Sequence, residues 1–250
     1  MAWTQEPDNL RPKFAQFGVL TGTPEFMLNS ALTLYDNLGT LRPMLAERLP
    51  TQENGDWIVK SDGNMVTTYR VRQNLRWHDG VPLTARDFAF AHRVYMDPAI
   101  PVSRDIERRM AQVEARDDHT LVIAWSELYP LANALGFSGL PPLPRHLLEE
   151  KYRTTAANEF VSGEEWSTSF VGSGPYRLER WERGARITVR ANPDWFLGPP
   201  RIQTIEVRFI GDPNTVLGHL LAGEVDFAST PVVRFDIPAA NELWAGRSDG

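Results

Sequence analysis

The sequence predicts a mixed α/β fold in which part of the chain forms antiparallel sheets. One observation is a strand-helix-strand pattern over residues 201–228, and a second is a pair of hairpin patterns over residues 56–77 and 174–192. The third is composition, because 19 prolines, 18 glycines and 8 tryptophans fit a loop-rich mixed architecture better than a helical bundle. With 250 residues and 42% hydrophobic content, the chain is long enough to bury a sizeable core.

Charge and composition exclude several classes of protein. The formal net charge of -6, with arginines interleaved among carboxylates, argues against a nucleic-acid binder. The absence of cysteine excludes disulfides and thiolate metal sites. The start "MAWTQEPDNLRP" lacks the basic and apolar regions of a secretory signal. We expect either a cytoplasmic protein or a chain from which the natural signal has been removed, with Met1 as an artificial start.

The first hairpin pattern lies between Asp56 and Trp77. Asp62-Gly63 is a turn signal, and the following residues alternate between apolar and polar. The residues expected on the buried face are Met65, Thr67, Tyr69 and Val71. The pattern therefore predicts an antiparallel sheet with one buried face.

The next helix has a well-specified start in the stretch "LRWHDGVPLTARDFAFAHR". Thr84 is an N-cap candidate with Asp87 three residues on, which is the capping-box pattern. Leu83 and Phe88 occupy the two positions of a hydrophobic staple. We expect a helix from Ala85 to about Met96 that Pro98 prevents from continuing.

His78-Asp79-Gly80 falls in the tight turn before this helix. Asp and Gly are favoured in such turns for backbone reasons, so we interpret His78 and Asp79 as structural residues rather than catalytic ones. The five histidines show no metal-ligand spacing, and we predict no metal site; they are His78, His92, His119, His146 and His219.

The middle of the chain carries further strand signals. A turn at Asp117-Asp118 precedes a short apolar strand from Leu121 to Trp125, and "LPPLP" at 140–144 must be extended. The second hairpin turns at Arg183-Gly184. In "VGSGPY", Ser173 lies between glycines, but the following proline and strand do not fit a nucleophile elbow. These glycines indicate a close chain crossing or a hinge, and no residue pattern supports an enzyme or a cofactor.

The strand-helix-strand unit is clear in "RIQTIEVRFIGDPNTVLGHLLAGEVDFA". Asp212 is a good N-cap, Pro213 suits the first helical position, and Gly223 suits the end of the helix. The segment "EVDFA" at 224–228 is then expected to be a strand, and this order favours a right-handed parallel crossover.

The order of several segments carries a resemblance to a known family. The segments are "WTQEPDNLRP", "TLYDNL", "RPMLAERLP", "YRVRQNLRWHDGVPLTARDFAFA", "VEARDDHTLVI", "PPLPRHLL", "VGSGPYRLERWERGARITVRANPDWFLGPPRIQTIEVRFI" and "LLAGEVDFA". Together and in order they resemble the extracytoplasmic solute-binding proteins, family 5, of ABC importers for oligopeptides, dipeptides, nickel and some oligosaccharides. In that family the W-x-D-G-x-P segment is a structural signature.

The resemblance implies a type II periplasmic-binding-protein-like α/β fold with three lobes. A mixed-sheet lobe I would comprise residues 1–42 and 170–235, and residues 43–169 would form an inserted, mainly antiparallel α+β lobe II. Residues 236–250 would begin a lobe III that is missing from this chain. Because the family encloses its ligand between lobes I and III, we expect little or no ligand affinity from the 250-residue chain.

The resemblance also places a ligand-facing loop at "TGTPEFMLN". We expect Thr21, Gly22, Thr23, Phe26 and Met27 to face the ligand, with backbone groups pairing to an extended solute. Equally, Phe26 and Met27 could pack beneath a helix expected at "NSALTLYDNL".

The function implied is that of a monomeric, non-enzymatic substrate-binding component, most often for oligopeptides or dipeptides, that delivers its solute to a membrane permease outside the cytoplasm. The alternative is a cytoplasmic two-lobe enzyme or regulatory protein that ends naturally at Gly250. Peptide, nickel chelate and oligosaccharide are not separated by any residue in the sequence.

Overall fold

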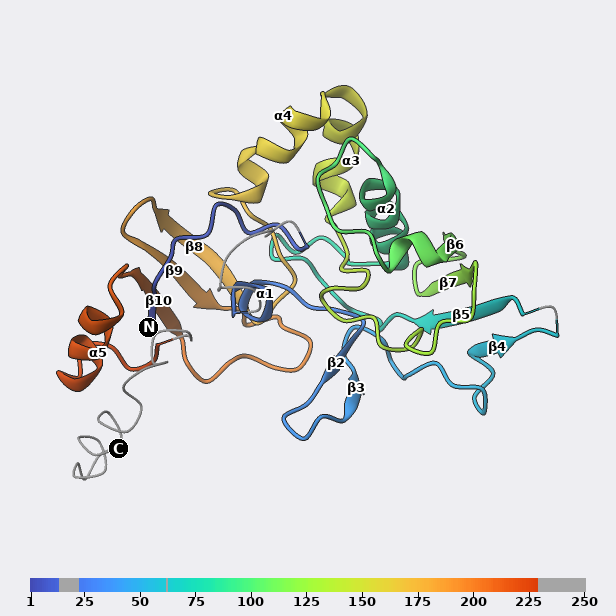
Figure 1. Cartoon of the computed structure of the whole chain (residues 1–250), viewed down its shortest axis with the longest axis horizontal. Coiled ribbons are helices and arrows are strands. Elements are labelled where there is room, and N and C mark those ends of the chain that lie inside the picture. The colour runs from blue at the N-terminus through green and yellow to red at the C-terminus, as the bar shows by residue number, and fades with distance from the viewer. Residues whose placement is uncertain (14–22, 62, 229–250) are drawn as a thin grey trace.

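A computed structural model describes residues 1–13, 23–61 and 63–228, and its elements are shown in Figure 1. The helices are α1 (Thr23–Leu28), α2 (Ala85–Met96), α3 (Arg145–Thr154), α4 (Ala157–Ser162) and α5 (Pro213–Leu221), with 3-10 turns η1 (Glu107–Arg109) and η2 (Glu164–Trp166). The strands are β1 (Ala2–Trp3), β2 (Thr33–Tyr35), β3 (Leu41–Pro43), β4 (Trp57–Val59), β5 (Met65–Arg70), β6 (Met110–Ala115), β7 (Thr120–Trp125), β8 (Tyr176–Glu182), β9 (Arg186–Ala191) and β10 (Thr204–Phe209). Within the described residues, no helix is long and apolar enough to span a bilayer.

One four-stranded sheet has the order β1-β10-β9-β8. β1 pairs with β10 in parallel, whereas the other pairs are antiparallel, so this sheet is mixed. The expected hairpin at 174–192 is confirmed as β8 and β9, and Gly184 in its turn has a φ of +74°. Ile187 and Val189 of β9 are buried on the core face of this hairpin.

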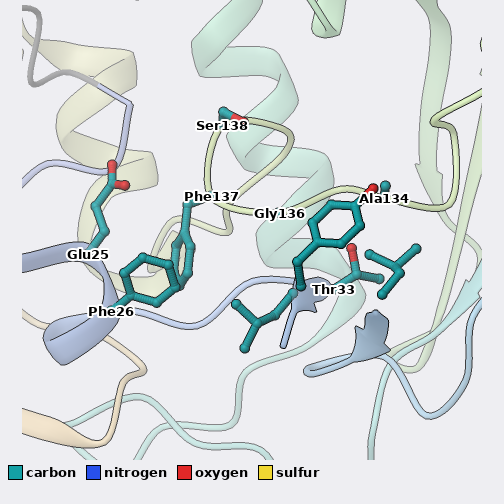
Figure 2. Close-up of a pocket in the computed structure, with 10 residues that line it drawn as sticks. Glu25, Phe26, Thr33, Ala134, Gly136, Phe137 and Ser138 are labelled. Atoms are coloured by element: carbon teal, nitrogen blue, oxygen red, sulfur yellow. The ribbon is translucent and has the colours of Figure 1, made fainter. Parts of the chain in front are cut away.

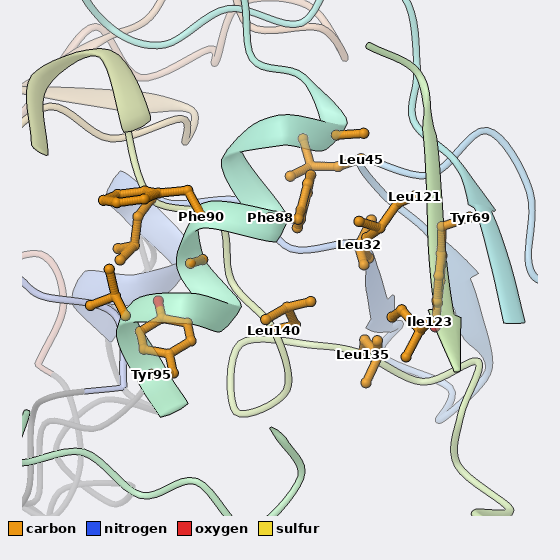
Figure 3. Close-up of a cluster of buried hydrophobic side chains, with 14 of the residues drawn as sticks. Leu32, Leu45, Tyr69, Phe88, Phe90, Tyr95, Leu121, Ile123, Leu135 and Leu140 are labelled. Atoms are coloured by element: carbon orange, nitrogen blue, oxygen red, sulfur yellow. The ribbon is translucent and has the colours of Figure 1, made fainter. Parts of the chain in front are cut away.

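The other four-stranded sheet has the order β4-β5-β7-β6 and is antiparallel throughout. The buried face predicted for the first hairpin is confirmed, because Met65, Thr67, Tyr69 and Val71 are all at most 1% exposed. This face packs against α2 in the largest apolar cluster, part of which is drawn in Figure 3. The two four-stranded sheets lie toward opposite ends of the long axis, with α1 between them (Figure 1).

Helix α2 has the bounds that its sequence predicts, Ala85–Met96. The capping box is present, and the Asp87 carboxylate accepts hydrogen bonds from the Thr84 backbone N–H (2.7 Å) and hydroxyl (3.3 Å). Leu83 and Phe88 are both buried, which is consistent with the predicted staple. The start of the helix is thus fixed by side chains that are close to it in sequence.

The predicted strand-helix-strand unit is confirmed for its first two members. Asp212 accepts from the backbone N–H groups of Asn214 (3.3 Å) and Thr215 (3.1 Å), and Gly223 has a φ of +75°. The strand expected at 224–228 is wrong for the described part of the chain, where only Ala228 forms an isolated parallel bridge, with Ala2. Phe227 is exposed, so this segment does not bury alternate side chains as a central strand would.

The helix expected at "NSALTLYDNL" is also wrong. Residues 33–35 form β2, which pairs with β3 across a turn. The turn forms because the Asp36 carboxylate accepts from the backbone N–H groups of Leu38 (3.0 Å) and Thr40 (2.9 Å), and Gly39 adopts a φ of +73°. These local hydrogen bonds offer the backbone an alternative to helix formation.

Candidate functional site

A surface pocket of about 400 Å³ lies between α1, the β2–β3 hairpin and the loop at 134–138 (Figure 2). Its lining is predominantly apolar and aromatic, with a few polar groups, which is the usual character of a small-molecule site. The lining residues are Glu25, Phe26, Thr33, Leu34, Tyr35, Leu41, Ala134, Gly136, Phe137 and Ser138.

Two phenylalanines from distant parts of the chain form one side of the pocket. The ring centroids of Phe26 and Phe137 lie 4.8 Å apart and the rings meet edge to face. Phe26 is nevertheless 50% exposed, and Tyr35 on β2 is 54% exposed. Exposed aromatic rings that line a hollow are suited to contact an apolar side chain of a bound molecule.

Glu25 and Thr33 supply two of the polar side chains that line the pocket. Burial raises the pKa of the Glu25 carboxyl, although a backbone hydrogen bond from Lys13 and the charge of Lys13 oppose this shift. Thr33 donates its backbone N–H to the Leu135 carbonyl (3.3 Å), while its buried hydroxyl has no hydrogen-bond partner among the described residues. A buried hydroxyl without a partner costs free energy, so a bound polar group that reached it would relieve that cost.

The residues predicted to face the ligand fall into three groups. Thr21 and Gly22 lie outside the described residues, and Thr23 begins α1. Phe26 lines the pocket, whereas Met27 is partly buried against the cluster that contains Leu28. The structure therefore brings Phe26 to the pocket and directs Met27 to packing.

Sequence reasoning missed two further aromatic residues that line the pocket, Tyr35 and Phe137. The available signal for Phe137 was an aromatic residue inside the glycine-flanked loop "GFSG" at 136–139. Tyr35 was missed because residues 29–38 were expected to be helical. Since Phe26 and Phe137 are far apart in the chain, local pattern alone did not pair them.

A buried ion pair contacts the end of the loop that carries Phe137. Lys13 pairs with Glu107 of η1, and its ammonium also donates to the Gly139 carbonyl (2.9 Å). Both side chains are almost fully buried, at 4% and 0% exposure. Burial lowers the pKa of Lys13 and raises the pKa of Glu107, although each partner opposes the shift of the other. The pair links the N-terminal segment to the loop that carries Phe137.

The segment that follows α1 makes a tight crossing with residues 172–174. The backbone N–H groups of Ser173 (3.1 Å) and Gly174 (2.9 Å) both donate to the Leu28 carbonyl. The Ser30 N–H donates to the Ser173 Oγ (3.1 Å), and the Ser30 hydroxyl donates to the Ser173 carbonyl (2.9 Å). We call residues 28–30 and 172–174 the chain crossing. Its geometry agrees with the crossing expected from "VGSGPY".

Glycine is required in this crossing. A Cβ on Gly174 would lie 2.6 Å from the Met27 carbonyl oxygen and 2.5 Å from the Asn29 nitrogen, and a Cβ on Gly172 would overlap the Leu28 carbonyl. Ser173 is buried and its hydroxyl is used in packing two backbones together. It therefore has a structural role, not the exposed position of a nucleophile.

His78 and Asp79 lie in the turn that the sequence predicts for them. Asp79 accepts from the Val81 N–H (3.1 Å) and contacts the His146 ring nitrogen Nε2 (2.6 Å). The described residues contain no group of three or more His, Asp or Glu side chains arranged to hold a metal ion.

Comparison with known structures shows the fold class. The oligopeptide-binding protein AppA from Bacillus subtilis, solved with a nonapeptide, aligns with 97% of this chain at a TM-score of 0.80 and 24% identity, and the aligned part is 45% of AppA. NikZ from Campylobacter jejuni, solved with Ni(L-His), aligns with 91% of this chain and 42% of its own at a TM-score of 0.74 and 24% identity. The chain thus has the periplasmic-binding-protein-like α/β fold, with one mixed and one antiparallel four-stranded sheet.

Sequence comparison shows the family. AppA is 27% identical over 221 residues, which cover 84% of this chain and 37% of AppA. The probable deoxycholate-binding periplasmic protein YgiS of Escherichia coli is 26% identical and is covered to 41%. Residues 40–241 match the family of bacterial extracellular solute-binding proteins, family 5 Middle, and the chain belongs to this family. It spans about two fifths of the length of these relatives.

Proposed function

We propose that the chain supplies one wall of the solute site in the substrate-binding component of an ABC-type importer, acting outside the cytoplasm and handing its solute to a membrane permease. The solute class is oligopeptide or dipeptide, and the protein acts as a monomer without catalysis. The observation that carries this proposal is the family match over residues 40–241 together with the open aromatic pocket at Phe26 and Phe137. The nonapeptide in the relative AppA supports the choice of peptide over the other solutes of the family.

The pocket suits a side chain of an extended peptide. The pocket has a volume of about 400 Å³ and an aromatic rim, so an apolar side chain that entered it would be removed from water. The Thr33 hydroxyl offers a hydrogen bond within the wall. Specificity would then be shared with surfaces supplied by other parts of a full-length protein. The division into lobe I, inserted lobe II and a following lobe III belongs to this proposal.

The test compares two phenylalanines that are similarly exposed. In a version extended to the length of the family relatives, Phe26→Ala should weaken binding of a defined nonapeptide about tenfold or more, because it removes one wall of the pocket. Phe227→Ala is the matched control, since Phe227 is 58% exposed but does not line the pocket. Isothermal titration calorimetry measures both affinities, and thermal melting of each variant reports stability.

The same titration on the 250-residue chain should give little or no heat, because one wall cannot enclose a peptide. Peptide binding at micromolar affinity or tighter by this chain would contradict that expectation. Equal affinities of the Phe26→Ala and Phe227→Ala variants would contradict the assignment of the pocket. Binding of Ni²⁺-histidine or deoxycholate in place of any peptide would overturn the proposed solute class.

A further inference from the structure

We infer that His78 is a positioning residue for the pocket, whose shape it maintains through hydrogen bonds to residues 172–174 of the chain crossing. The inference rests on the proposed function for its meaning, since it concerns the same pocket. It assigns a role to the histidine of the "WHDG" turn, which is not among the residues that line the pocket and whose ring bonds Gly172 and Gly174.

The ring of His78 uses both nitrogens on the glycines of the crossing. Nδ1 accepts the Gly172 N–H (3.1 Å), and Nε2 lies 3.1 Å from the Gly174 carbonyl oxygen. Because Nδ1 accepts the Gly172 N–H, Nδ1 cannot itself carry a hydrogen. The neutral ring therefore has its proton on Nε2, which donates to the Gly174 carbonyl. The His78 backbone N–H also donates to the Gly172 carbonyl (2.9 Å). The buried His78 thus takes part in three hydrogen bonds with residues 172–174, two as donor and one as acceptor.

The crossing transmits this constraint to both walls of the pocket. Residues 172–174 bind Leu28 and Ser30 through backbone groups and the Ser173 hydroxyl. Leu28 is the last residue of α1, which carries Glu25 and Phe26, and Ser30 lies three residues before β2, which begins at Thr33. The α1 wall precedes the chain crossing in the sequence and the β2 wall follows it. The distance between the two walls therefore depends on how the crossing is held.

The surroundings of the ring favour its neutral form. Burial lowers the pKa of His78 to about 4; Arg177 of β8 acts in the same direction, while the Gly174 carbonyl and Asp79 oppose it. The Arg177 guanidinium is held beside the crossing by Asn192 Oδ1 (2.9 Å) and Asp194 (2.8 Å), and Asn192 also donates to the Gly174 carbonyl (3.2 Å). Protonation would place a second donor on Nδ1, facing the Gly172 N–H, and would break that bond.

The test is hydrogen exchange on the 250-residue chain without any ligand. His78→Phe keeps a ring in the site but loses both side-chain bonds, so the amides of residues 28–35 should lose protection about tenfold at pH 7. Amides of β5 and β7 should keep their protection. Phe160→Leu is the control, because Phe160 is a buried ring of the largest cluster and lies outside the crossing and the pocket. This variant should leave residues 28–35 unchanged.

Ser30→Ala is a second variant in case His78→Phe does not fold. It removes the hydroxyl that donates to Ser173 and should lower protection over the same residues. In the unaltered chain, protection of residues 28–35, corrected for intrinsic exchange, should fall as pH approaches 4, and this local fall should be absent from His78→Phe. Uniform loss of protection along the chain, or none at 28–35, would overturn the inference. Hydrogen exchange is measured without ligand, so its result can be interpreted even if the calorimetric test shows that no peptide binds.

Discussion

The turn and helix over residues 75–96 and the pocket wall over residues 23–41 differ in where their stabilising contacts come from. In the first region, Trp77, Leu83 and Phe88 are buried, and the helix start is capped by a residue three positions away. In the second, Phe26 is half exposed and its ring partner comes from the loop at 134–138. The helix start in the first region is set by neighbours in sequence, although its buried side chains pack with distant strands, whereas the pocket wall depends on contacts between distant segments.

This difference is consistent with the position of residues 75–96, none of which lines the pocket. A turn with its own cap and staple forms reproducibly, so it can serve as a fixed support. A binding wall needs open surface, and half-exposed aromatic rings contribute less to folding than buried ones. His78 connects the two regions, because it belongs to the turn and binds the chain crossing that follows α1.

The largest expected effect is at the crossing. Gly174→Ala should destabilise the chain by more than about 4 kcal/mol or prevent folding, because the added Cβ overlaps the backbone of Met27 and Asn29. Gly218→Ala is the matched control, since a Cβ there meets nothing within 4 Å, and inside α5 it should stabilise by up to about 1 kcal/mol. Urea unfolding measures both, and equal stability of the two variants would show that the crossing is not tightly packed.

Loss of the Lys13–Glu107 ion pair should give the next largest effect on stability. Lys13→Met should cost about 3–5 kcal/mol at pH 7, because it leaves the Glu107 carboxylate buried without its partner. The variant should raise the pKa of Glu107 further, so the loss should shrink as pH falls and the carboxyl becomes protonated. The double variant Lys13→Met with Glu107→Gln should recover part of the stability. A loss that did not depend on pH would indicate that packing, rather than charge, is responsible.

The smallest effect is expected at the helix start. Asp87→Asn should cost about 1–2 kcal/mol, because the carboxylate accepts from the Thr84 N–H with one oxygen and from the Arg145 N–H (3.1 Å) with the other. An amide cannot accept at both positions. Asp118→Asn removes an exposed ion pair with Arg86 and should change stability by less than about 0.5 kcal/mol. Chemical denaturation of both variants checks the contrast, and a larger loss at Asp118 would reverse it.

Much of the local structure could be predicted because its signals are short-range. Thr84 and Asp87 specify the start of α2, and alternation from Met65 to Val71 specifies the buried face of a sheet. The failures also have a local cause. The helix expected at residues 29–38 ignored the Asp36 side chain, which binds the backbone of a turn and favours a hairpin instead.

The candidate site was less accessible to such reasoning. Phe26 was predicted to face a ligand, and it does line the pocket, but its neighbour Met27 packs against the core. A one-residue difference along a short helix changes which way a side chain points, and the sequence pattern does not fix that rotation. Thr21 and Gly22 lie outside the described residues, so their role remains a prediction.

By itself, the sequence determined the class of fold, the bounds of α2, the buried face of the first hairpin, and a resemblance to the family of solute-binding proteins that the family match then showed. Capping residues, alternating apolar residues and turn residues act over a few positions of the chain, so they can be recognised from the sequence alone. Only the tertiary structure decided that Phe26 meets Phe137, that Lys13 meets Glu107, and that His78 clamps two glycines. These contacts join segments distant in the chain, and their geometry depends on packing of the whole fold.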